Sequence, residues 1–178
     1  MNTYISMLRG INVGGQKKVR MPELKSLYES LGFANIETYV QSGNVVFNSE
    51  EKDNEKLTKS IEEQIEKTFG FAVPVLMRSA DDLQRVIENH PFKDEEPVRV
   101  LVTFLYQQPD QAKLDDLNRY EDKVDKFAIG AQEIFLFCPG GYGRTKLSNT
   151  FFENKLGVVA TTRNWKTVNT LFQMTSER

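Results

Sequence analysis

Residues 36–48, IETYVQSGNVVFN, are predicted to form two short strands joined by a tight connection. The residues of 36–40 and 44–48 favour extended backbone, and Gly43 suits a hairpin turn between them. Helical spacing of apolar residues flanks this hairpin over 21–31 and over 57–69. Two further apolar runs, 3–8 and 73–78, stand at the outer ends. The resulting order, strand–helix–strand–strand–helix–strand, is the ferredoxin-like pattern.

The same order of elements recurs after a linking helix at 81–90. We expect strands at 98–106, 124–129, 133–138 and 158–161, helices at 110–120 and 147–156, and a closing amphipathic helix that begins near Trp165. The predicted fold is therefore α+β, with two ferredoxin-like (βαββαβ) halves in tandem. The expected limits are 1–79 for the first half, 80–97 for the linking helix and loop, and 98–178 for the second half with the C-terminal helix.

The strands of the second half are apolar on both faces, as in VRVLVTFLY at 98–106 and EIFLFC at 133–138. Strands of this kind are usually covered on both faces. Since the helices of a ferredoxin-like half cover one face, we expect the sister half or another subunit to cover the other. This pattern disfavours an open sheet as a binding platform.

Composition excludes several kinds of protein. The chain of 178 residues has a net charge of −2, a single histidine and a single cysteine. One cysteine excludes an internal disulfide and indicates a reducing compartment. No apolar run is long enough to span a membrane, and a secretory signal is not expected from the first residues. We expect a cytoplasmic protein that does not enter the membrane.

The chain offers few groups for catalysis. His90 and Cys138 are the sole residues of their types, so the sequence holds no cluster of zinc ligands. No nucleophile–base pair is visible, no catalytic residue or metal site is predicted, and the sequence leaves the cofactor open. These features favour a binding protein, with the enzyme question left open.

Basic residues gather at two glycine-rich stretches. The first, LRGINVGGQKK at 8–18, belongs to a segment (9–20) with four cations and no acidic residue. It lacks the P-loop lysine, because Gln16 stands at that position, and it lacks the second glycine of GxGxxG, because Asn12 stands there. What remains is a choice between an anion-binding loop before a helix and a glycine turn with solvated lysines. The candidate ligand residues are Arg9, Gly10, Asn12, Gly14, Gly15 and Lys17.

The second stretch, CPGGYGRTKLSN at 138–149, also leads from a predicted strand into a helix. Further along, TTRNW at 161–165 is expected to open the last helix, with Thr162 or Asn164 as its cap. An arginine at such an entrance pairs with a carboxylate or binds a phosphate. The candidate residues of this second surface are Arg144, Thr145, Lys146, Ser148, Arg163 and Asn164.

The predicted topology determines the end of the sheet at which each loop lies. We expect the loops after the first and third strands of a half to lie at the same end. Each glycine-rich loop would then occupy the corresponding end of its own half, and residues 41–44 (QSGN) would lie at the opposite end of the first half.

Three ordered motifs carry a resemblance to a known family. LRGINVGG at 8–15, TYVQSGNVVF at 38–47 and TKLSNTFFENKLGVVATTRNWKTV at 145–168 resemble the domain of unknown function 1697, a family of mostly bacterial proteins. The resemblance implies a two-part α+β fold with ferredoxin-like halves. It implies no activity, substrate or cofactor, so no catalytic residue can be transferred from it.

The leading functional hypothesis is binding of a phosphorylated or other anionic small molecule, such as a nucleotide, at the glycine-rich basic loops. The alternatives are nucleic-acid binding along a basic loop edge and a role as a protein-interaction module. The nucleic-acid alternative lacks the basic-glycine-aromatic signature of RNA-recognition strands, because 42–48 reads SGNVVFN. The ligand and the oligomeric state do not follow from the sequence.

Overall fold

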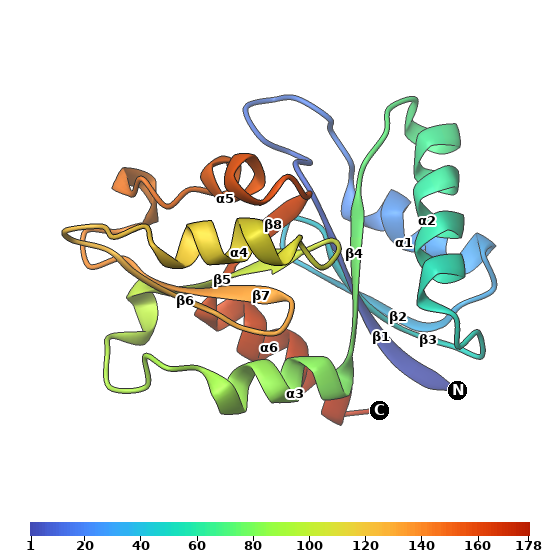
Figure 1. The fold of residues 1–178 in the computed structure, drawn as a ribbon. Helices are drawn as coiled ribbons and strands as arrows, with labels where there is room; N and C mark the ends of the chain where they lie inside the picture. Colours follow the sequence, from blue (N-terminus) through green and yellow to red (C-terminus); the bar gives the residue numbers. More distant parts are fainter. The chain divides into compact units, whose positions relative to one another are not determined.

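A computed structural model describes all residues from Met1 to Arg178 (Figure 1). It contains two four-stranded antiparallel sheets, with strand orders β2-β3-β1-β4 and β6-β7-β5-β8. Both orders are ferredoxin-like, so the predicted fold class is confirmed. No helix is both long and apolar enough to cross a membrane.

The first sheet and its helices are β1 (Asn2–Leu8), α1 (Met21–Ser30), β2 (Ala34–Tyr39), β3 (Asn44–Ser49), α2 (Asn54–Phe69) and β4 (Val75–Ser79). The remaining elements are α3 (Ala80–Asn89), the 3₁₀ turn Pro97–Arg99, β5 (Val100–Leu105), α4 (Gln111–Asn118), β6 (Lys126–Ile129), β7 (Glu133–Phe137), the 3₁₀ turn Tyr142–Arg144, α5 (Asn149–Leu156), β8 (Ala160–Asn164) and α6 (Trp165–Ser176).

The chain divides into two compact units, Met1–Gln84 with Leu171–Arg178, and Arg85–Thr170. These units are not the same division as the domain limits predicted from the sequence (1–79, 80–97 and 98–178). The predicted limits stay a prediction. Helices α3 and α6 each contribute residues to both units, and the end of α6 belongs to the first. The amphipathic pattern from Trp165 onward predicts this helix but not the unit that its end joins.

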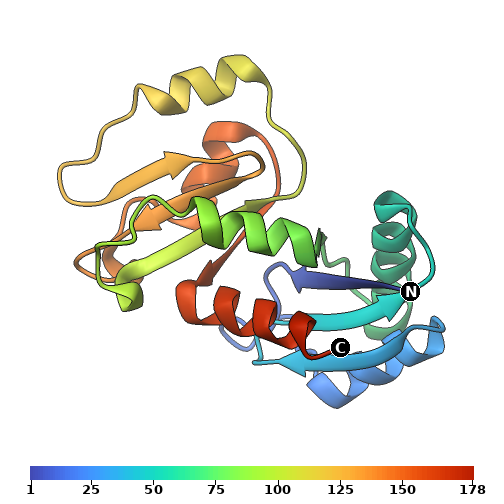
Figure 2. The same ribbon diagram turned by 90° about the horizontal axis from the view of Figure 1, so that it is seen from below.

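The core of the first unit lies between its sheet and the two helices α1 and α2. The sequence of 53–70 explains the limits of helix α2. Asp53 caps its start by accepting hydrogen bonds from the N–H groups of Glu55 and Lys56, and Gly70 ends it in the left-handed conformation. Between these ends, Leu57, Ile61 and Ile65 form one apolar stripe, and all three are buried. Figures 1 and 2 show α1 and α2 on one face of the sheet and the end of α6 on the other.

The other face of this sheet is buried as well. Ile5, Met7, Val46 and Leu76 alternate with the residues that face α1 and α2, and they are almost entirely inaccessible to solvent. This sheet therefore offers no open platform on which bases could stack.

In the second unit, α4 and α5 pack together on one face of the sheet (Figure 1). Every residue of β5 and β7 is buried, as expected from strands that are apolar on both faces. On the face away from α4 and α5, the ring of Phe135 stacks at 6.1 Å on His90, whose ring also lies 4.3 Å from that of Trp165. The single histidine is thus part of an aromatic cluster.

Candidate functional site

The first glycine-rich stretch forms a small hairpin. Asn12 N–H donates to Lys17 O at 3.1 Å, and Gln16 N–H donates to Val13 O at 3.0 Å. Gly14 and Gly15, the two central residues of the turn, have φ of 58° and 75°. Positive φ at both central positions is the geometry of a type I′ hairpin turn, which explains the glycine pair. The loop is a closed turn and not a cradle wrapped around the start of α1.

Asn12 and Lys17 are both bonded within the fold. The Asn12 amide accepts from Val19 N–H at 2.9 Å and donates to Val19 O at 2.9 Å and to Gln41 O at 2.8 Å. The Lys17 ammonium donates to Ala72 O at 3.1 Å. These bonds explain the two residue types through the structure of the loop.

The loops of the first unit meet in an arrangement that differs from the expected one. Leu8 N–H donates to Gly43 O at 2.8 Å, and Arg9 N–H donates to Pro74 O at 3.0 Å. The loop after β1, the 40–43 turn and the loop before β4 therefore lie at one end of the sheet. The expectation that 41–44 would lie at the opposite end is wrong. The reason is that β3 runs antiparallel to both β1 and β2, so the β2–β3 turn returns to the end where β1 finishes.

The same rule applies in the second unit. Leu105 N–H donates to Gln132 O at 3.0 Å, whereas Cys138 N–H donates to Arg99 O at 2.9 Å. The glycine-rich loop after β7 thus lies where β5 begins, at the end opposite to the loop after β5. The two glycine-rich loops occupy non-equivalent ends of their halves, and the prediction of corresponding ends is wrong.

The second glycine-rich loop is ordered by its own hydroxyl groups. The Tyr142 hydroxyl accepts from Asn149 N–H at 2.7 Å, and the Ser148 hydroxyl accepts from Phe151 N–H at 3.1 Å. Both bonds cap the first turn of α5. The N–H groups that an anion would use at this helix start are therefore occupied in part by the protein.

Thr145 links this loop to a buried carboxylate. Its hydroxyl donates to Asp125 Oδ2 at 2.5 Å and accepts from Leu147 N–H at 2.9 Å. Asp125 is largely buried, so this hydrogen bond gives its carboxylate a partner where little water reaches it. Thr145 holds the loop against the segment before β6.

The space between that segment and the loop is an open hollow of about 500 Å³. Arg144 and Lys146, both exposed, lie on its loop side beside Gly140 and Gly141. The opposite side is formed by 120–125. Of the residues predicted for a ligand, this hollow brings together Arg144 and Lys146.

Acidic groups line the opposite side of the hollow. The Asp122 carboxylate accepts from the N–H groups of Asp125 at 2.8 Å and Val124 at 3.0 Å. These two hydrogen bonds lower the pKa of Asp122, which keeps the carboxylate ionised. With Glu121, Asp125 and one cation, Lys123, beside it, this side of the hollow is mainly acidic, whereas the loop side carries Arg144 and Lys146.

Arg163 lies within strand β8, and only Asn164, the last residue of that strand, stands at the entrance of α6. β8 extends to Asn164 and pairs with β5, with Val102 opposite Arg163. The Arg163 side chain is buried and donates to Thr161 Oγ1 at 2.7 Å and to Thr162 O at 3.1 Å. Burial lowers the pKa of Arg163 to about 10. The predicted strand 158–161 began two residues before β8 and stopped three residues before its end, because the polar residues Thr161, Thr162 and Arg163 lack the apolar pattern by which strands were predicted.

Asn164 caps α6, and it was one of the two caps expected from the sequence, the other being Thr162. Its side-chain oxygen accepts from Thr167 N–H at 2.8 Å. Asn164 is therefore both the last residue of β8 and the cap that precedes α6, which explains an amide at this position.

Two groups near the second glycine-rich loop escaped sequence reasoning. A Cβ atom on Gly141 would lie 3.0 Å from Arg99 Nη1, so a third cation borders this loop. Asp125 is the second of these groups, because its carboxylate accepts a hydrogen bond from Thr145 in the loop. Arg99 lies just before β5 and Asp125 just before β6, and strand pairing brings both residues to the loop. No local sequence motif reveals this proximity. No group of three or more His, Cys, Asp or Glu side chains is placed to hold a metal ion.

Comparisons with known proteins identify a family and a similar solved structure. The sequence profile of a family described as "Protein of unknown function (DUF1697)" matches residues 1–135. Comparison with curated proteins finds no match. Among solved structures, that of the conserved bacterial protein SP0830 from Streptococcus pneumoniae is similar, with 26% identity, a TM-score of 0.80 and 98% coverage of each chain. Neither description states an activity, a ligand or a partner.

Proposed function

We propose that this chain, which belongs to the DUF1697 family of proteins of unknown function, binds a small anionic ligand in the hollow beside the second glycine-rich loop. The family predicted from the three sequence motifs is confirmed by the match over residues 1–135. The observation that carries the proposal is the pair of exposed cations, Arg144 and Lys146, on one side of a hollow of about 500 Å³. A guanidinium and an ammonium at one surface suit phosphate or carboxylate oxygens.

The carboxylates of the hollow narrow the class of ligand. A simple anion would gain from Arg144 and Lys146 but would be repelled by Glu121 and Asp122 on the other side. A compound that joins a phosphate to hydroxyl or amino groups matches both sides, because its donors can meet the carboxylates. Sugar phosphates and nucleotides have this composition.

The backbone at Gly140 and Gly141 supports the same proposal. Without side chains, these residues leave the loop side of the hollow open to a ligand beside Arg144. The first glycine-rich loop, with Arg9, Gly10 and Lys17, stays a predicted second surface. A cytoplasmic location is part of the proposal, supported by Cys138, which is buried and unpaired.

Ligand-dependent thermal stability tests the proposal. We would compare inorganic phosphate, ribose 5-phosphate, AMP and a short single-stranded RNA at low and moderate salt. A ligand at a hundredfold excess over its dissociation constant stabilises the folded protein by about 2.7 kcal/mol. We expect a sugar phosphate or AMP to raise the melting temperature of the wild type, and we expect Arg144→Ala with Lys146→Ala to abolish the rise. Lys25→Ala, an exposed lysine on α1, is the matched control and should keep it.

Two outcomes would reject the proposal. One is an equal rise in wild type and double variant, which would place the ligand elsewhere. The other is stabilisation by RNA alone that falls steeply with salt, which would favour nucleic-acid binding.

A further inference from the structure

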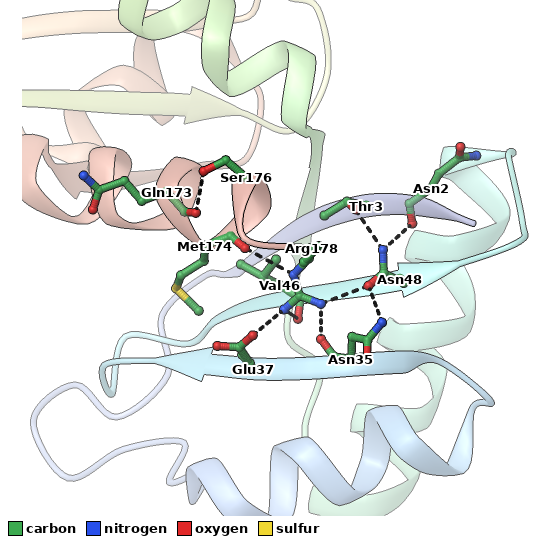
Figure 3. Close-up of polar contacts among 10 residues, drawn as sticks. All are labelled: Asn2, Thr3, Asn35, Glu37, Val46, Asn48, Gln173, Met174, Ser176 and Arg178. Atoms are coloured by element: carbon green, nitrogen blue, oxygen red, sulfur yellow. Dashed lines mark hydrogen bonds and ion pairs between the residues drawn. The ribbon is translucent and has the colours of Figure 1, made fainter.

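Every N–H donor of the Arg178 guanidinium is hydrogen-bonded within the first unit (Figure 3). A guanidinium has five N–H donors. Nε donates to Met174 O at 3.3 Å; Nη1 donates to Asn35 O and, at 2.9 Å, to Asn48 Oδ1; Nη2 donates to Glu37 Oε1 at 3.0 Å and to Val46 O at 3.3 Å. The side chain is only 8% exposed. This is a complete set of acceptors for one planar cation.

Four of these five acceptors belong to β2 and β3. The register of the two strands shifts between Ala34 and Glu37, which is a β-bulge. Asn35 lies within the bulge with φ of 52°, and its carbonyl oxygen accepts from the guanidinium. The site thus exists because β2 carries one residue more than its partner strand at this place.

The orientation of Asn48 is set independently of Arg178. Its side-chain NH₂ donates to Thr3 Oγ1 at 2.8 Å, which directs Oδ1 toward the guanidinium, and the same Oδ1 accepts from Asn35 Nδ2 at 3.1 Å. Figure 3 shows Asn48 between these partners. An acceptor that is already oriented costs little conformational entropy when a cation binds.

The acceptor set distinguishes a guanidinium from an ammonium. Lysine has three donors on a tetrahedral nitrogen and leaves two of the five acceptors unused. Glu37, whose side chain is 58% exposed, supplies the single negative charge that one guanidinium needs.

We propose that the bulge of β2, with Asn35, Glu37, Val46 and Asn48, is a guanidinium-binding site that Arg178 fills in cis. When the Arg178 side chain is absent, the site binds a free alkylguanidinium, the group at the end of an arginine side chain in a peptide. This inference is independent of the proposed ligand at Arg144 and Lys146.

Chemical rescue of Arg178→Ala tests the inference with the full chain. Loss of the charged hydrogen bonds should lower the melting temperature by about 4 °C or more. Millimolar ethylguanidinium should raise it again in a saturable manner, and ethylammonium at equal concentration should not. Wild type should not respond to ethylguanidinium, because its site is filled. Arg178→Lys should recover only part of the stability that Arg178→Ala loses, because two of the five acceptors stay unused.

A matched double variant locates the rescue. Arg178→Ala with Glu37→Gln keeps the bulge but removes its charge, and the concentration of ethylguanidinium for half-maximal rescue should rise at least tenfold. The side-chain NH₂ signals of Asn35 and Asn48 in NMR spectra of Arg178→Ala should shift with ethylguanidinium, whatever its effect on stability. No shift of these signals, or equal responses to ethylguanidinium and ethylammonium, would overturn the inference.

Discussion

The side-chain amide of Asn12 donates a hydrogen bond of 2.8 Å to the carbonyl oxygen of Gln41. This bond joins the first glycine-rich loop to the turn between β2 and β3. The same amide bonds both backbone groups of Val19, a buried residue. One side chain therefore satisfies three backbone groups from two loops, and it does so with a backbone φ of 55°, where asparagine is favoured over most residues.

Asn12→Gly should lower the free energy of unfolding by about 1–3 kcal/mol, because the buried polar groups of Val19 lose their partners. Asn12→Ala should cost about 1 kcal/mol more, since alanine at positive φ adds backbone strain that glycine avoids. Urea unfolding of the two variants checks both values. Equal stability of Asn12→Gly and wild type would show that water replaces the amide fully.

Gly43→Ala should destabilise the first unit. A Cβ atom there would lie 2.6 Å from Ile11 Cδ1, and φ is 86°, so steric overlap adds to strain. We expect a loss of about 2–4 kcal/mol. Gly14→Ala is the control, because its φ of 58° is also positive but no atom lies within 4 Å of the added Cβ. A similar loss for both would mean that Ile11 moves aside without cost.

Val40→Asn should stabilise the protein. Val40 has φ of 54°, a conformation that β-branched residues rarely adopt, and its side chain is 47% exposed, so little burial is lost. Asparagine at this position should raise the free energy of unfolding by about 1 kcal/mol. Thermal and urea unfolding measure the change. A lower stability would indicate that the valine side chain makes contacts that outweigh the strain.

His90 should titrate below the ordinary value of 6.5, because burial, and secondarily Lys93, lowers its pKa. The unfolded chain then binds more protons than the folded one below about pH 6.5. Stability from this group is present above pH 6.5 and is lost as pH falls through the folded-state pKa. His90→Gln should remove that part of the pH dependence.

A single histidine makes the measurement direct, because one imidazole signal is followed by NMR. A midpoint at or above 6.5 would contradict the expected direction.

The fold was predictable because local signals agreed with tertiary structure. Pro22 stands at the start of α1, and Gly32 and Gly70 follow the ends of α1 and α2 with the positive φ that glycine allows. The helical spacing of Leu57, Ile61 and Ile65 likewise predicts the stripe that the structure buries. The end of β8 was missed because Arg163 is buried in a way that hydropathy does not indicate. Strand pairing with β5, and not residue type, makes this segment a strand.

The candidate site was predictable only in part. Arg144 and Lys146 stand beside glycines in the sequence, and the structure places them together on one hollow. Asp125 and Arg99 reach the same loop from distant positions, through contacts that no linear motif encodes. Sequence spacing therefore identified the cations of the loop but not its neighbours.

The non-equivalent placement of the two glycine-rich loops has a consequence for the history of the chain. By strand order, the counterpart of 9–20 in the second half is 106–110, and the counterpart of 138–148 in the first half is 50–53. Neither counterpart contains a glycine. Duplication of one ancestral half would therefore not by itself account for both loops, because each glycine-rich loop stands on a crossover that is short in the other half.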